Sequence, residues 1–220
     1  AIGPKLKWIK SNLDDKIYLF TLLVISILLS ILIVKNFSSN FLINTILISS
    51  ALYLFFITLR DFFNKGFKNL AQNMAHFGFS LLILSILFNS LFSSEIITNL
   101  KVGETFENTK TKIVFESISQ KEEKNYNSIV AKFTVQDSKG KLENLSPELR
   151  IYNQPNIATS EADIKTTLLS DKFIVINIVQ NQEFFNVRYQ VKPFMLWIWI
   201  SVILISVGGL VSFVKKEYEK

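Results

Sequence analysis

The stretch AQNMAHFGFSLLILSILFNSLF, residues Ala71–Phe92, decides the fold, because it is a long and predominantly apolar run without a formal charge. A helix needs about 20 residues to cross roughly 30 Å of hydrocarbon, and at this length in lipid only a helix satisfies its own backbone. The stretch also holds the only histidine of the 220-residue chain, His76. We therefore expect a membrane span that carries a single imidazole.

Three further blocks have the length and the composition of membrane spans. Together with the third span, the four cover residues 17–34, 41–59, 74–92 and 193–214. We expect residues 1–92 to hold an N-terminal arm and three transmembrane helices, residues 93–192 to form a domain outside the membrane, and residues 193–220 to hold the fourth helix and a basic tail. The predicted fold class is an α-helical membrane protein with an extracytoplasmic β-rich domain between helices three and four.

The positive charge of the chain follows the predicted spans. The net charge is +6, yet residues 93–192 hold 13 basic and 13 acidic side chains, so the excess lies beside the apolar blocks. Lysine and arginine collect in the N-terminal arm, in the loop around residues 60–68 and in the tail, whereas the loop between the first two spans holds only Lys35. This asymmetry predicts that both termini are cytoplasmic and that the β-rich domain lies in the periplasm or its mitochondrial equivalent. It also argues against nucleic acid as a partner.

The chain contains no cysteine. A disulfide framework, a thiolate metal site and a thiol nucleophile of its own are therefore excluded. With a single histidine and no cysteine, a structural zinc site is excluded as well.

The domain between the third and fourth spans has the alternation of β-strands. In residues 128–136, Ala131, Phe133 and Val135 fall on one face, and the sequence DSKG then predicts a turn. We expect further strands in TKIVFESIS (111–119), ELRIYN (148–153), KFIVINIV (172–179) and FFNVRYQV (184–191). The segment TSEADIKTT, residues 159–167, is expected to be a short polar connection with one helical turn.

His76 has helical neighbours that suit two roles. Gln72 and Ser80 lie one turn to either side, Phe79 is at i+3, and small residues stand beside the histidine. In one interpretation the imidazole only hydrogen-bonds a neighbouring helix. In the other it is an axial ligand of haem iron, with Gln72 or Ser80 holding the second ring nitrogen. A proton relay is disfavoured, because none of the four spans contains an acidic residue.

Several motifs resemble one family. NMAHFGFSLLIL (73–84) is similar to the MAHxG segment of CcmF, the haem lyase membrane subunit of cytochrome c maturation. LSPELRIYNQPNIATSEADIKTT (145–167) resembles another run of that family, VRYQVKPFMLWIWISVILISVGGLVSF (187–213) resembles its ending, and IGPKLKW (2–8) fits a third segment. The matches follow the family in order, over its C-terminal part. The tryptophan-rich haem-handling segment of the family has no counterpart here.

The resemblance implies a b-type haem in the helix bundle, with His76 as one axial ligand and the second ligand from outside this chain. It implies a part in the covalent attachment of haem to apocytochrome c, at the bacterial inner membrane or the mitochondrial inner membrane. Catalytic residues are not identified, and we expect the chain to be inactive as an enzyme without the rest of the bundle. Implied partners are that bundle, the haem chaperone CcmE, a thioredoxin-like CcmH-type subunit, apocytochrome c and the lipid membrane.

Two questions stay open at this point. Glu148, Arg150 and Tyr152 share one strand face, and Arg150 and Tyr152 are either a partner contact or a salt bridge with ring packing. The alternative function for the whole chain is a non-catalytic structural subunit or scaffold of the maturation complex. The sequence also leaves open whether the chain is a natural subunit or a fragment.

Overall fold

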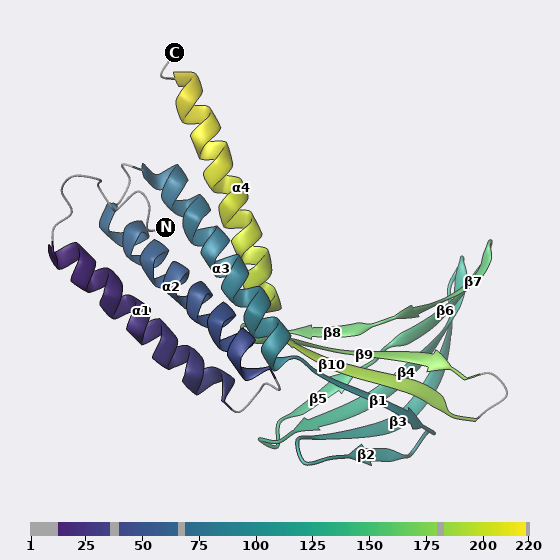
Figure 1. Cartoon of the computed structure of the whole chain (residues 1–220). Helices are drawn as coiled ribbons and strands as arrows, with labels where there is room; N and C mark the ends of the chain where they lie inside the picture. Colours follow the sequence, from purple (N-terminus) through teal and green to yellow (C-terminus); the bar gives the residue numbers. More distant parts are fainter. Residues whose placement is uncertain (1–12, 36–39, 66–68, 180–182, 219–220) are drawn as a thin grey trace. The chain divides into compact units, whose positions relative to one another are not determined.

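The structure, a computed structural model, describes residues 13–35, 40–65, 69–179 and 183–218 (Figure 1). The chain divides into two compact units. The helical unit comprises Ala1–Phe92 and Pro193–Lys220, and the β unit comprises Ser93–Lys192. The IGPKLKW segment and the lysines of the N-terminal arm before Lys16 lie outside the described residues.

In the part of the chain that the structure describes, four helices have the length and hydropathy needed to cross a membrane. They are α1 (Leu13–Val34), α2 (Phe41–Lys65), α3 (Leu70–Phe92) and α4 (Met195–Tyr218). A β-rich unit lies between α3 and α4 in the chain, so the predicted combination of four membrane-type helices with a β-rich domain between the third and fourth is confirmed.

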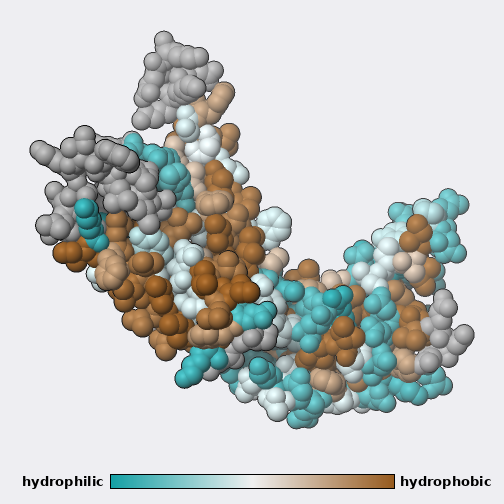
Figure 2. Space-filling view, in the orientation of Figure 1, coloured by the Kyte–Doolittle hydropathy of each residue, from teal (hydrophilic) through white to brown (hydrophobic). Residues whose placement is uncertain are grey.

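Each helix packs on the next in chain order, which gives a row rather than a closed bundle (Figure 1). The outward faces are covered by apolar side chains (Figure 2), as they would be where lipid or further helices surround them. Hydroxyls inside the spans are satisfied locally. Ser26 donates to the carbonyl of Leu22 at 2.8 Å, and Ser201 donates to that of Trp197 at 2.6 Å.

The β unit is a sandwich of two sheets. The first sheet has the order β1-β10-β9-β8, and the second has the order β2-β3-β4-β6-β7, with β5 paired to β4. The strands are β1 (Ser94–Leu100), β2 (Thr105–Glu107), β3 (Thr111–Glu122), β4 (Tyr126–Asp137), β5 (Leu142–Leu145), β6 (Glu148–Asn153), β7 (Asn156–Glu161), β8 (Asp163–Thr166), β9 (Ser170–Ile178) and β10 (Phe185–Pro193).

The inward residues of both sheets form the core. Ala131, Phe133 and Val135 are at most 2% exposed, so the face predicted from their alternation is the core face. Phe115 of β3 stacks on Phe133 with ring centroids 4.4 Å apart. The other sheet contributes Ile174, Ile176, Val187 and Tyr189.

The expectation for TSEADIKTT was wrong. Most of this segment lies in two strands, β7 and β8, which are antiparallel to β6 and β9. Its polar composition suggested a connection. Both strands are terminal members of their sheets, however, and an edge strand with one wet face needs few apolar residues.

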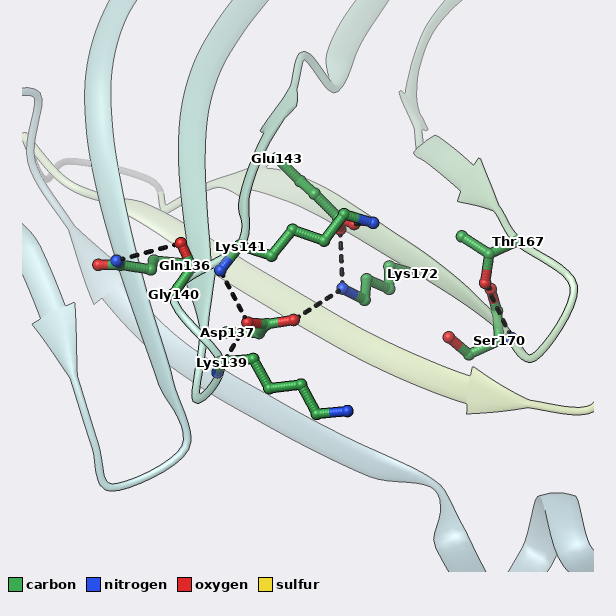
Figure 3. A network of polar contacts seen from close by, with 9 residues as sticks. All are labelled: Gln136, Asp137, Lys139, Gly140, Lys141, Glu143, Thr167, Ser170 and Lys172. Atoms are coloured by element: carbon green, nitrogen blue, oxygen red, sulfur yellow. Dashed lines mark hydrogen bonds and ion pairs between the residues drawn. The ribbon is translucent and has the colours of Figure 1, made fainter.

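One buried charge joins the two sheets (Figure 3). The side chain of Glu143, on β5, is 1% exposed, and its oxygens lie 2.9 Å from the ammonium nitrogens of Lys141 and Lys172. Lys172 comes from β9 of the other sheet and also lies 3.8 Å from Asp137. Burial alone would raise the pKa of Glu143, but the two ammonium groups outweigh it and hold the pKa below its usual range.

We predict that Lys172→Met destabilises the β unit, because it leaves the Glu143 carboxylate buried with only the exposed Lys141 as a partner. The expected loss is about 3 kcal/mol, at the lower end of the range for broken buried pairs. The measurement is hydrogen exchange of the β5 and β9 amides in the detergent-solubilised chain. Lys101→Met, which breaks an exposed pair with Glu183, is the control and should leave the exchange of these amides close to that of the wild type, because solvent screens an exposed pair.

The loss of stability caused by Lys172→Met should depend on pH. Because folding lowers the pKa of Glu143, its contribution is present above the unfolded pKa of about 4.3 and is lost as pH falls through the folded pKa. The difference between wild type and Lys172→Met should therefore shrink below about pH 4. A difference that stays constant down to pH 3 would show that the ion pair is not its source.

Candidate functional site

His76 lies on an exposed face of α3. Gln72, His76 and Phe79 are all exposed, at the helical spacing that places them on one stripe, and Ile86 continues it at 48% exposure. Among the described residues, His76 has no hydrogen-bond partner. The imidazole is therefore presented outward from the row of helices and is not used to join α3 to its neighbours.

Ser80 is directed elsewhere, although it lies one turn from His76. It is fully buried, its hydroxyl lies 2.6 Å from that of Thr58 on α2, and it donates to the carbonyl of Phe77 at 2.8 Å. The expectation that Ser80 could orient the imidazole does not fit this geometry, because its hydroxyl is already used between α2 and α3. Gln72 is exposed on the same face as His76, so its side chain is still placed to orient the imidazole.

The two phenylalanines beside His76 also differ. Phe77 packs on α2, with its ring centroid 5.7 Å from that of Phe55 and 5.4 Å from that of Phe62. Phe79 is 54% exposed on the histidine face. Of the two rings, only that of Phe79 therefore lies on the face of His76.

The small residues near His76 serve helix packing. A methyl group added at Gly78 would lie 3.0 Å from the Ser201 carbonyl oxygen and from side-chain carbons of α4. One added at Gly208 would lie 2.8 Å from the backbone oxygen of Ala71 and from the backbone nitrogen of Ala75. Helix α4 thus occupies the side of α3 that carries the alanines and Gly78, and the His76 side is left exposed.

Asn73 is a polar residue of α3 that the sequence did not single out. It is 6% exposed, and its Nδ2 has no hydrogen-bond partner among the described residues. No signal in the sequence separated it from the many other asparagines of the chain.

The site can supply one nitrogen ligand. The described residues contain no group of three or more histidine, cysteine, aspartate or glutamate side chains that could hold a metal ion. An outward imidazole with an apolar ring and an amide on the same face fits one axial position of a haem. The chain has no second histidine for a bis-imidazole site.

On the β unit, Arg150 is held by its neighbours. Its Nε donates to Glu148 at 2.9 Å, and its guanidinium carbon lies 5.0 Å from the centre of the Tyr126 ring. Tyr126 in turn packs on Tyr152 with centroids 5.3 Å apart. The hydrogen bond to Glu148, followed by one to Tyr152, raises the pKa of Arg150. Arg150 and Tyr152 are thus brought together, far along the sequence from His76.

Residues 91–193 match the family described as the CcmF C-terminal beta-sandwich. A cytochrome c-type biogenesis protein CcmF from Pseudomonas aeruginosa is 25% identical over 172 residues, which cover 72% of this chain and 26% of that protein. The cytochrome c-type biogenesis protein ccl1 from Rhodobacter capsulatus is 32% identical over 118 residues, covering 54% and 18%.

A solved structure named Cytochrome c Heme Lyase CcmF has the same fold. The TM-score is 0.67 at 17% identity, and the match covers 95% of this chain and 36% of that one. The chain spans about a quarter of the length of the Pseudomonas relative.

We predict that Gly208→Ala disrupts the α3–α4 contact, because the added methyl group meets backbone atoms that cannot turn aside. The expected cost is about 1–3 kcal/mol, as for other overpacked sites, measured as a lower thermal midpoint of the solubilised chain. Gly209→Ala is the matched control, since a methyl group there has nothing within 4 Å. Equal midpoints for the two variants would contradict the packing described above.

Proposed function

We propose that the chain corresponds to the C-terminal part of the CcmF proteins and is a component of a cytochrome c haem lyase that binds a b-type haem through His76. The observation that carries the proposal is the position of the only histidine. It lies within a membrane span, on the face of α3 that no other helix of the chain covers among the described residues.

Physical chemistry supports a covered rather than a lipid-facing imidazole. Ionisable side chains inside a membrane are costly and normally face a protein interior or a cavity. The matched part of this chain covers only 26% of the Pseudomonas relative. We propose that further helices, outside this chain, cover the His76 face and supply the second axial ligand.

In this proposal three residues of α3 have different roles at the haem. His76 would hold the haem iron, Gln72 would orient the imidazole ring through its second nitrogen, and Phe79 would exclude water from the same face. A haem bound there would supply a one-electron redox centre within the membrane.

The proposed overall reaction is the attachment of a separate haem to apocytochrome c on the outer face. Each cysteine S–H adds across a vinyl C=C, so that a C–S bond forms and the proton moves to the adjacent carbon, without an external oxidant. The thiols come from the apocytochrome, since this chain has none. We propose that the haem chaperone CcmE and a CcmH-type subunit deliver the two reactants, and that the chain is inactive without the rest of the helix bundle.

We place the chain in the inner membrane of a bacterium, with both termini cytoplasmic and the β unit in the periplasm. The domain limits 1–92, 93–192 and 193–220 agree with that topology. We propose that the β unit shapes the outer docking surface. Glu148 and the tyrosine rings already engage Arg150, so Arg150 and Tyr152 would act there as a rigid surface patch rather than as a free cation.

The test is a reduced-minus-oxidised absorption spectrum of the complex that contains this chain. We predict that His76→Ala abolishes the b-type signal, because one axial ligand is lost. Ser80→Ala is the control one turn away and should leave the signal unchanged, since Ser80 faces α2. An unchanged spectrum in His76→Ala would instead support the alternative, a non-catalytic scaffold in which His76 only packs.

A further inference from the structure

The turn between β8 and β9 presents two leucines to solvent. It is a tight turn, in which the backbone nitrogen of Thr167 donates to the carbonyl of Ser170 at 3.0 Å and the Thr167 hydroxyl donates to the same oxygen at 2.7 Å. At its tip, Leu168 is 63% exposed and Leu169 is 64% exposed. Ile164, three residues before the turn, is 57% exposed. Three large apolar side chains are thus exposed within six residues.

Leucines are unusual at such a place. Tight turns favour glycine, asparagine, aspartate and proline, which adopt the required backbone angles or hydrogen-bond the turn. Two other turns of the β unit obey this rule, with the sequences DSKG (137–140) and NQPN (153–156). Nothing in the turn geometry calls for leucine at positions 168 and 169, so the side chains need another explanation.

The topology of the sheet places this turn at the end of the β unit that joins the membrane spans. Strand β1 begins at Ser94, two residues after the end of α3, and β10 ends at Pro193, two residues before α4. Ser94 pairs with Val191, so both connections leave from one end of the sheet.

The direction of β9 places the leucine turn at this same end. Strands β9 and β10 are neighbours of nine residues each, and only a short segment joins them. Such a segment is too short for a parallel crossover, so the two strands are antiparallel. The first residue of β9, Ser170, therefore lies at the end where β10 finishes. The turn that carries the leucines precedes it directly.

We propose that Leu168 and Leu169 insert into the interfacial layer of the lipid bilayer and anchor the β unit on the membrane surface. The proposal goes beyond the haem function and rests only on α3 and α4 being membrane spans. An exposed apolar tip flanked by cations is the form of a shallow lipid anchor. Lys165 is exposed beside the tip. Lys139 is exposed in the DSKG turn, which lies at the same end because its first residue, Asp137, is 3.8 Å from Lys172 near the start of β9 (Figure 3). Such lysines suit lipid phosphates.

The absence of cysteine makes the test direct. Leu169→Cys is labelled with a nitroxide in the full chain, which is then reconstituted into vesicles of phosphatidylethanolamine and phosphatidylglycerol. Power-saturation electron paramagnetic resonance then compares collision with oxygen, which partitions into lipid, and with a water-soluble nickel chelate. We expect oxygen to collide with the label at position 169 several-fold more effectively than the chelate does.

Ile157→Cys is the matched control. Ile157 is also exposed, at 50%, but β7 reaches β9 through a Ser160–Asn177 hydrogen bond near the opposite end of that strand. Its label should favour the nickel chelate. If the label at 169 also favours the chelate, the tip is in water and the proposal is overturned. If that label is shielded from both reagents, the tip lies against protein, and the proposal is overturned in favour of a protein contact.

Discussion

The close approach of α3 and α4 is the contact on which the arrangement of the helices depends. In lipid no hydrophobic force drives helices together, so association relies on small residues that let backbones approach. Gly78 and Gly208 provide this on the two helices, where an added methyl group would come within 3.0 and 2.8 Å of the partner. Asn89 adds a hydrogen bond of 2.6 Å to the carbonyl of Pro193. These are also the helices that precede β1 and follow β10, which pair with each other.

The contact between α3 and α4 determines which side of α3 is covered, and His76 lies on an exposed side. Three sides of α3 are distinguishable: the alanines and Gly78 face α4, Phe77 and Ser80 face α2, and Gln72, His76 and Phe79 remain exposed. Had the histidine fallen one position earlier or two positions later, on the Ala75 or Gly78 side, α4 would have excluded any ligand. Its actual position leaves room for a large planar group or for another helix, but gives the imidazole no partner of its own among the described residues.

Features set by strong periodicity could be predicted from the sequence, whereas features set by side-chain packing could not. The spans and the core face of β4 belong to the first kind, because length in lipid and alternation are local properties. Strands β7 and β8 were missed, since an edge strand has little apolar signal. The direction of the Ser80 hydroxyl could not be read from the sequence for a different reason. Spacing put it one turn from His76, and only the position of Thr58 on α2 shows that its hydroxyl is already used. The exposure of Leu168 and Leu169 required the topology as well.

The charges of the β unit bear on the proposal that His76 carries the chemistry of the chain. Its 13 basic and 13 acidic residues balance, and several pairs are tied across strands, most deeply where Lys172 meets Glu143 between the sheets. A buried carboxylate fixed by two ammonium groups stabilises the pairing of particular strands but offers no free proton acceptor near neutral pH, because its pKa is lowered. Arg150 is likewise engaged by Glu148 and an aromatic ring. These charges of the β unit are thus engaged with one another, whereas the imidazole that we propose as a metal ligand lies on the exposed face of α3.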